Sequence, residues 1–405
     1  MLLANNGFLN DVHSAASGKG MPGIRALGTT ILCESTDAEN IRKGIDEELD
    51  NIIGALTNPL TGEEKSPEVK TGTEPKIAFK GTYDQVNQFF YRKGWGDGLP
   101  VTPPSQARVD EMMKGTDLSP DHVVAKLIPR MGKATIEKIA VNAVMAGALP
   151  THMPVLIAAV DALSDPKTRF DTFEVSTGSW APLLIINGPI RNDIHVNCSS
   201  GMMSPGNIAN AAIGRALGLI VKNIGGARKA IEDMGTLGDP LKYTLVVGEN
   251  EENSPWEPLN VELGYAKGSS TVTVMFPNRY TQTIPAQTTA EGIATALAGM
   301  NPTSLSTMLV IPDHANRFAS EGWSKQKVKD FIMEKSGMRN SPRLGKLENE
   351  DFAIVVAGGP GVWMGLLQSA GGFGNSFVTR EIRLPQNWEG LKAKYGTMVP
   401  TYVRY

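Results

Sequence analysis

Apolar residues recur along this chain with two different periods, which predicts a protein built from both helices and strands. Helical spacing gives one group of segments, 83–91, 135–147, 153–163, 288–299 and 325–335. Short continuous apolar runs give a second group, 182–187, 243–247, 270–276, 306–311 and 352–357. The two groups are interleaved, so we expect an α/β fold with one large mixed domain over residues 79–405.

Two shorter patterns add detail to this outline. Residues 1–60 predict a partial α/β unit, with a buried strand at 29–33 and an amphipathic helix from Asp37. One strand cannot close a domain, so another chain or the rest of this protein should complete it. Residues 61–78 are polar and predict a linker. Segments 134–147 and 289–299 both end in Ala-Gly, an echo too short to indicate duplication.

The composition of the chain argues against several classes of protein. The net charge of −3 over 405 residues gives no electrostatic case for binding nucleic acid or an anionic membrane surface. We find no run of about 20 apolar residues, the length that a membrane-spanning helix needs. Two cysteines make no disulfide framework and favour the reducing cytoplasm. Five scattered histidines do not predict a dedicated zinc site.

Cys198 is the first residue we suspect of chemistry. It lies in a Gly/Ser-rich loop before a helix predicted to begin at Ser204 and Pro205 and to end at Gly225. A helix N-terminus favours anions and lowers the pKa of a nearby thiol, and His195 could assist. Two interpretations stay open, an activated nucleophile and an inert buried cysteine. Separately, the loop could cradle an anion through Ser199, Ser200 and Gly201.

The second cysteine and an acidic loop are further candidates. Cys33 ends the predicted first strand, and the carboxyl end of a strand faces the ligand crevice in open α/β sheets. A small core residue is the competing interpretation. Glu249, Glu251 and Glu252 follow another predicted strand, where carboxylates act as general bases or metal ligands. Trp256 between two prolines predicts a rigid loop, against the alternative of an ordinary charged surface loop.

Polar residues near helix ends or glycine-rich turns form a last group that could hold a substrate. Its members are Asp97, Lys138, Asn142, Asn210 and Arg215. Solvation or structural hydrogen bonding is the competing interpretation for each of them. The turn at 94–98 matches neither a P-loop nor the dinucleotide fingerprint, so it does not predict nucleotide binding.

Four segments carry a family resemblance. Residues 93–104, 129–147, 213–217 and 249–258 resemble the large conserved region of the UGSC-type (seleno)protein family, and the resemblance covers about residues 80–385. Residues 11–33 also resemble the end of a UGSC domain. In that domain a selenocysteine or cysteine precedes the histidine, whereas residues 4–9 here contain no cysteine. The motif then belongs to a separate small subunit, precedes Met1, or is absent.

Taken with the resemblance, the sequence predicts a partial flavodoxin-like α/β unit followed by the large mixed domain. The resemblance implies thiol or selenol chemistry. We expect a cytoplasmic, oligomeric reductase or carbon–heteroatom lyase acting on a small polar substrate that carries a carboxylate. Cys198 or a partner's thiol or selenol is its nucleophile, and Glu249 or Glu252 handles the proton. No cofactor is evident. The alternatives are a hydrolase or lyase that uses carboxylates, with or without a divalent cation, and a non-catalytic subunit.

Overall fold

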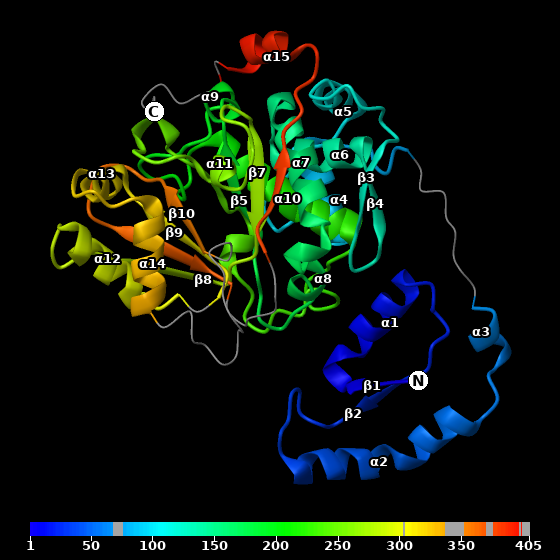
Figure 1. Cartoon of the computed structure of the whole chain (residues 1–405). Helices are drawn as coiled ribbons and strands as arrows, with labels where there is room; N and C mark the ends of the chain where they lie inside the picture. The colour runs from blue at the N-terminus through cyan, green and yellow to red at the C-terminus, as the bar shows by residue number, and fades with distance from the viewer. Residues whose placement is uncertain (68–75, 303, 337–351, 370–375, 397, 399–405) are drawn as a thin grey trace.

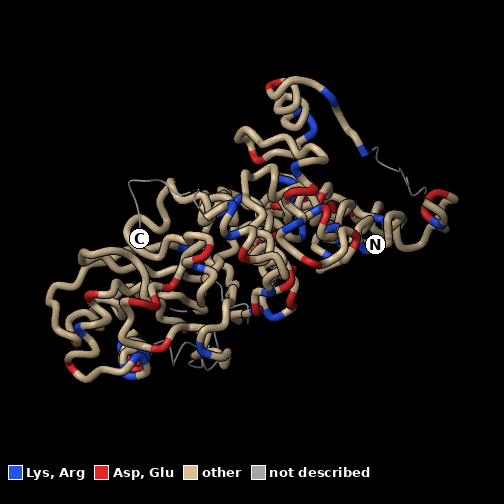
Figure 2. The backbone as a smooth tube through the Cα atoms, turned by 90° about the horizontal axis from the view of Figure 1, so that it is seen from above, with Lys and Arg blue, Asp and Glu red and all other residues tan. Residues whose placement is uncertain are grey.

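The chain has a mixed α/β fold, as predicted. The computed structural model describes residues 1–67, 76–302, 304–336, 352–369, 376–396 and 398. Lys and Arg are interspersed with Asp and Glu along the backbone (Figure 2). Within the described residues, no helix combines the length and the apolar character needed to cross a bilayer.

The N-terminal unit has the order β-α-β-α. Strand β1 (Leu2–Asn5) pairs in parallel with β2 (Ala26–Thr29), and the helices are α1 (Leu9–Gly18) and α2 (Ala38–Thr57). The Asp37 side chain caps α2 at the expected place. The predicted strand at 29–33 was wrong, because the backbones of Ile31 and Leu32 bond to the side chains of Asn5 and Asn40. A short helix, α3 (Gly62–Lys65), lies in the predicted linker.

Helices dominate the next part of the chain. It contains α4 (Tyr83–Lys93), α5 (Gln106–Met113), the hairpin β3 (Val123–Leu127) and β4 (Gly132–Thr135), α6 (Ile136–Ala146), α7 (Met153–Leu163) and α8 (Phe170–Phe173). Helix α6 begins at a capping Thr135 side chain and ends at Gly147, whose φ of 80° is left-handed. The sequence pattern placed α7 at its observed bounds.

Two four-stranded sheets form the centre of the molecule. The first has the order β12-β7-β5-β6, with β5 (Leu183–Asn187), β6 (Val246–Gly248), β7 (Thr271–Met275) and β12 (Val378–Glu381). The second has the order β10-β9-β11-β8, with β8 (Arg279–Thr283), β9 (Ser306–Val310), β10 (Phe352–Val356) and β11 (Met364–Gln368). Each sheet contains one parallel pair, β5 with β6 and β9 with β10.

The two sheets follow one plan with their last strands exchanged. The strands fall into two series in chain order, β5 to β8 and β9 to β12. In each series the first two strands are a parallel pair, and two further strands follow them. The third strand of each series lies antiparallel to the first, but β8 pairs with β11 and β12 pairs with β7. Helices α10 (Ile208–Ile220) and α14 (Lys325–Lys335) connect the parallel pairs, packing on α6 and α12 (Ala290–Gly299). The Ala-Gly echo therefore falls on equivalent helices.

The sheets pack face to face between two helical layers. Leu183 and Ile185 of β5 join one apolar cluster with Leu309 of β9 and Val355 of β10. The alternate residues Leu184 and Ile186 face a second cluster with α6, α7 and α10. A third cluster covers the other sheet with α12, α13 (Pro312–Ser320) and α14. Figure 1 shows the resulting order of helices, sheet, sheet and helices. Because both of their faces are buried, β5, β7, β9 and β10 appear as largely apolar runs.

The N-terminal unit touches the large domain through α1. The Ser14 hydroxyl donates a hydrogen bond to Glu232, a carboxylate that Arg228 also holds. Asp11 lies on the same helix, and its burial, together with the charge of Glu232, raises its pKa to about 6. When the contact forms, the pKa of Asp11 is higher than in the free helix, so losing the proton weakens the contact. The contact should therefore weaken as pH rises from about 4 to about 6.

We therefore expect Asp11→Asn to strengthen the contact of α1 at neutral pH. Hydrogen exchange in α1, corrected for intrinsic rates, should be faster at pH 7.5 than at pH 5 in the parent protein and equal at both in the variant. Asp46→Asn, on an exposed position of α2, is the matched control. An unchanged pH dependence in Asp11→Asn would contradict the assignment.

Candidate functional site

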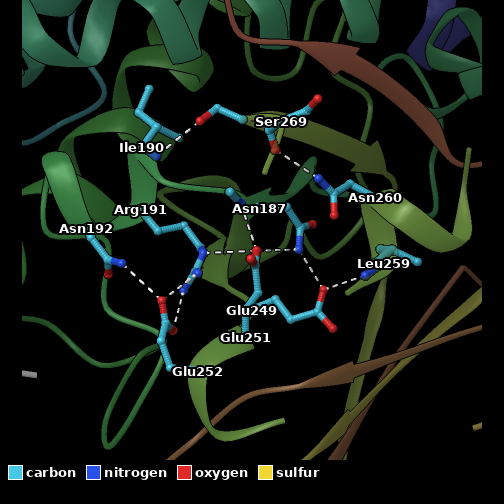
Figure 3. Close-up of polar contacts among 12 residues, drawn as sticks. Asn187, Ile190, Arg191, Asn192, Glu249, Glu251, Glu252, Leu259, Asn260 and Ser269 are labelled. Atoms are coloured by element: carbon cyan, nitrogen blue, oxygen red, sulfur yellow. Dashed lines mark hydrogen bonds and ion pairs between the residues drawn. The ribbon is translucent and has the colours of Figure 1, made fainter. Parts of the chain in front are cut away.

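The candidate site lies where two parallel strands end side by side. Asn187 is the last residue of β5, and Glu249 directly follows β6. The Asn187 side-chain amide donates to Glu249 Oε2 at 2.7 Å and to Glu251 Oε1 at 3.0 Å. The backbone N–H of Gly188 donates to the same Glu251 oxygen at 2.7 Å. Figure 3 shows these contacts at the strand ends, where open α/β sheets bind ligands.

A buried arginine joins the two strand-end loops. Arg191, in α9 (Ile190–Asp193), is 2% exposed, and its guanidinium lies 3.1 Å from Glu251 and 3.0 Å from Glu252. Asn192 also donates to Glu252, at 3.0 Å. Burial opposes ionisation of Glu252, but the hydrogen bonds from Arg191 and Asn192 outweigh it and lower its pKa to about 2. Glu252 is therefore a carboxylate at neutral pH, a weak base that has no proton to supply.

Glu249 has the opposite character. Its side chain is fully buried, and burial raises its pKa despite the nearby charge of Lys325. Its Oε2 accepts hydrogen bonds from Asn187 and, at 2.7 Å, from the backbone N–H of Leu259. Its Oε1 lies 4.0 Å from Lys325 Nζ and has no hydrogen-bond partner among the described residues. Of the two predicted proton carriers, Glu249 is the one suited to hold a proton.

Lys325 extends this network into the second helical layer. It pairs with Glu262 of α11 (Leu259–Glu262) at 2.8 Å, and Lys329 binds the same carboxylate. Lys329 is 3% exposed, and its burial lowers its pKa although Glu262 opposes the shift. The strand-end loops of the first sheet are thus tied to α14, which covers the second.

Cys198 lies beside Arg191 and is half-buried. Its burial raises the pKa of the thiol, and the negative charge of Glu252 raises it further. The charge and hydrogen bond of Arg191 lower the same pKa. The predicted start of the following helix at Ser204 was wrong, because Gly206 has a φ of 140° and α10 begins only at Ile208.

A network of buried asparagines fixes the Cys198 loop. The Asn210 side chain exchanges hydrogen bonds with the backbone of Asn197, at 2.8 and 3.0 Å, and donates to Val246 O at 3.0 Å. Asn197 Oδ1 in turn accepts from the Ser199 N–H at 2.8 Å. The side chain of Asn210, a predicted substrate ligand, thus makes its hydrogen bonds to this loop and to β6. Its network is also why the local helix-start signal of the sequence was overridden.

The glycine-rich turn that follows β10 of the second sheet packs against the Cys198 loop. The N–H of Gly358 donates to Cys198 O at 2.9 Å. A Cβ at Gly359 would lie 1.7 Å from the Ser200 hydroxyl oxygen, so only glycine fits there. Gly201 has a left-handed φ of 68°. Ser199, Ser200 and Gly201 therefore face a glycine-rich turn, an arrangement that leaves backbone groups close together.

An adjoining cleft of about 530 Å³ is large enough for a small ligand. Its lining includes Arg191, Glu251, Glu252, Trp256 and Lys267. The Trp256 ring packs on Phe318 of α13 at 5.8 Å between centroids. The rigid loop predicted around Trp256 therefore lines the cleft. Sequence reasoning did not select Asn187, Arg191 or Lys325.

The remaining predicted residues lie outside this site. His195 is exposed, and its ring bonds to Gly396 O at 2.9 Å. Cys33 is exposed in the N-terminal unit, beyond β2. Arg215 and Asp97 pair with each other at 2.6 Å near the other end of α10.

Two residues of α6 complete the set. Lys138 is exposed, whereas the Asn142 side-chain oxygen accepts a hydrogen bond from Asn223 at 2.7 Å. Within the described residues, no three His, Cys, Asp or Glu side chains are grouped so as to hold a metal ion.

No family model, curated protein or solved structure matches the chain. The resemblance to the UGSC-type family therefore stays a prediction.

The packing of Cys198 on β6 can be tested with Gly248→Ala. The added Cβ would lie 3.1 Å from Cys198 Cβ and 3.2 Å from Val196 Cγ1, so we expect the free energy of unfolding to fall by about 1–3 kcal/mol. Urea denaturation measures this change. Gly299→Ala, where a Cβ meets open space, is the control and should lose nothing. Equal loss, or none, in both variants would contradict the packing.

Glu249→Gln tests the buried carboxyl. Because the pKa of Glu249 is raised in the folded state, the protein should lose stability as pH rises through that value. The neutral amide removes this loss, so the urea midpoints of variant and parent should diverge in favour of the variant between pH 5 and pH 9. Glu257→Gln, at an exposed position of the same loop, is the control. Parallel pH profiles would show that Glu249 is ionised throughout.

Proposed function

We propose that the protein is an enzyme that uses the Cys198 thiol on a small polar molecule bound at the ends of β5 and β6. The observation that carries this proposal is the position of Cys198, half-buried beside the guanidinium of Arg191. Arg191 supplies positive charge to a developing thiolate. Glu252, ionised and hydrogen-bonded to Arg191, holds that guanidinium in place, and the thiol proton passes to solvent.

The reaction class that we propose is reductive cleavage of a carbon–heteroatom bond. Cys198 Sγ forms a bond to the heteroatom while the carbon–heteroatom bond breaks, and the carbon takes that electron pair and a proton. Two external thiols then become a disulfide: their electron pair reduces the sulfur–heteroatom bond, the heteroatom leaves as its hydride, and Cys198 is restored as the thiol. A reducing cytoplasm supplies such thiols. The glycine-rich turn at 358–361 lies against the Cys198 loop, where the backbone N–H groups of Gly359 and Gly361 can contact a carboxylate of the substrate.

The two cysteines allow a matched test of this proposal. Alkylation by iodoacetamide should modify Cys198 in the native protein, and Cys198→Ser should abolish turnover of small carbon–heteroatom substrates in dithiothreitol, whereas Cys33→Ser should retain it. Glu252→Gln removes a charge that raises the thiol pKa, so alkylation of Cys198 at pH 7.5 should become several-fold faster. Glu257→Gln should leave that rate unchanged. Full turnover in Cys198→Ser, or a native Cys198 that resists alkylation, would overturn the proposal.

A second candidate rests on Glu249. A fully buried carboxyl with a raised pKa and an oxygen without a hydrogen-bond partner among the described residues is typical of a general acid. In this alternative, the protein is a hydrolase or lyase that activates water with its carboxylates, with or without a divalent cation. Loss of turnover with a chelator or in Glu249→Gln, together with resistance to alkylation, would favour it over the thiol mechanism.

A third candidate rests on the N-terminal unit. Its parallel sheet contains β1 and β2, and the apolar side chains of Leu2 and Leu3 are 40% and 37% exposed. A small subunit that carries the redox motif of the UGSC resemblance could add strands at this sheet. The chain would then act within an oligomer, with the partner supplying the thiol or selenol. Purification from the native source as a monomer, with no second chain attached, would count against this alternative.

A further inference from the structure

A cavity of about 670 Å³ lies at the opposite end of α10 from Cys198. It is bounded by α4, by the turn that holds Trp95, by α6 and by the residues that follow α10. Helix α10 has 13 residues, which at 1.5 Å per residue separates its two ends by about 20 Å. The volume is in the range of small-molecule sites, and the proposed function does not use it.

Aromatic rings form one wall of the cavity. Phe90 and Trp95 line it and meet edge to face, with centroids 5.4 Å apart and planes at 85°. Phe79 also lines the cavity and stacks on Phe89 at 4.6 Å, and Phe89 in turn contacts Trp95 at 5.6 Å. Rings packed in this way hold one another in fixed orientations, so an aromatic ligand that stacks on one ring meets the other ring edge to face.

The turn that carries Trp95 is held from behind by α10. Arg215 binds Asp97 at 2.6 and 2.9 Å and also bonds to Pro100 O at 2.9 Å. Lys222 donates to Gly96 O, and Asn223 donates to Trp95 O at 2.9 Å. Arg215 and Asp97, predicted from the sequence to bind substrate, instead set the position of an aromatic wall.

Lys222 and Asn223 belong to an uncommon type of helical turn. Val221–Gly225 forms a π-helical turn at the end of α10, before the left-handed Gly226. Such turns make up well under 1% of residues in proteins and are frequent at functional sites. This one brings Lys222 and Asn223 to the Trp95 turn, and Asn223 also donates to Asn142 Oδ1 at 2.7 Å. The two asparagines give the cavity a polar edge beside its aromatic wall.

The charges at the cavity have one sign. Lys76 and Lys80 line it, both are exposed, and the described lining includes no Asp or Glu. A cation at the rim of an aromatic cavity attracts a ligand that is both flat and negatively charged. Val86, Val141 and Met145 supply the remaining apolar surface.

We infer that this cavity is a second ligand site, which binds a planar aromatic anion such as an aromatic carboxylate. The ring lies against Phe90 and Trp95, Asn142 and Asn223 bond to polar atoms on its edge, and the carboxylate faces Lys76 and Lys80. The site is separate from Cys198, so it does not depend on the proposed thiol chemistry.

Calorimetric titration of the full chain with naphthalene-2-carboxylate tests the site. We expect saturable binding of one molecule per chain with a dissociation constant below about 1 mM, and at least fivefold weaker binding of cyclohexanecarboxylate, which has no flat ring. Val141→Trp fills the cavity from a half-buried position and should weaken binding at least tenfold. Val123→Trp, at an exposed position of β3, is the matched control and should bind as the parent does.

A second variant keeps the test independent of folding at Val141. Lys80→Glu, at an exposed rim position, should weaken binding of the carboxylate several-fold and leave binding of 2-naphthol nearly unchanged, whereas Lys126→Glu on β3 should change neither. Prior alkylation of Cys198 should not affect binding. No saturable binding, equal binding by the Val141→Trp and Val123→Trp variants, or loss of binding after alkylation of Cys198 would overturn the assignment.

Discussion

The exchange of one strand between the two sheets is the constraint on which the large domain depends. Strand β8 leaves the first series to pair with β11, and β12 leaves the second series to pair with β7. Neither sheet is complete without a strand from the other half of the domain. Contacts between strands so far apart in sequence form only after much chain entropy has been lost, so the two halves should fold as one cooperative unit. The face-to-face packing of Ile185 and Val355 adds to this dependence.

The candidate site follows from that arrangement. Loops after β5 and β6 supply Arg191 and Glu252, whereas the second half supplies Lys325 and the glycine turn against Ser200. A buried guanidinium is costly unless charges and hydrogen bonds satisfy it, and here two carboxylates do so. Burial and the charge of Glu252 oppose a thiolate at Cys198, whereas the charge and hydrogen bond of Arg191 favour it. The charges that satisfy Arg191 therefore also set the pKa of the thiol.

The sequence predicted the parts of the fold that carry strong local patterns. Helices α7 and α14 were placed at their observed bounds, and β5, β7, β9 and β10 to within a residue or two, because both faces of these strands are buried. Strand β8 was missed because its side chains are mostly exposed and polar. The start of α10 was wrong because tertiary bonds between Asn197 and Asn210 override a good local cap.

The candidate site residues also divide into those with a local sequence signal and those that matter only through tertiary contacts. Glu249 and Cys198 were selected from the sequence because a carboxylate after a strand and a rare cysteine are local signals. Arg191 was missed because its importance comes from burial, which no pattern around it reports. Arg215 and Asp97 were each noticed, but their pairing joins positions 118 residues apart and could not be inferred from either one.

Helix α10 and the turn that follows it contact both the Cys198 loop and the Trp95 turn. At its start, Asn210 bonds to the Cys198 loop and to β6, and Thr244 donates to Asn210 O at 2.6 Å. A Cβ at Gly214 would lie 2.3 Å from the Thr244 hydroxyl, so the helix is packed too closely to rotate. At its end, Arg215 and Asn223 hold the Trp95 turn. Because this packing fixes α10, the helix holds the Cys198 loop and the Trp95 turn in place without making either one depend on the other.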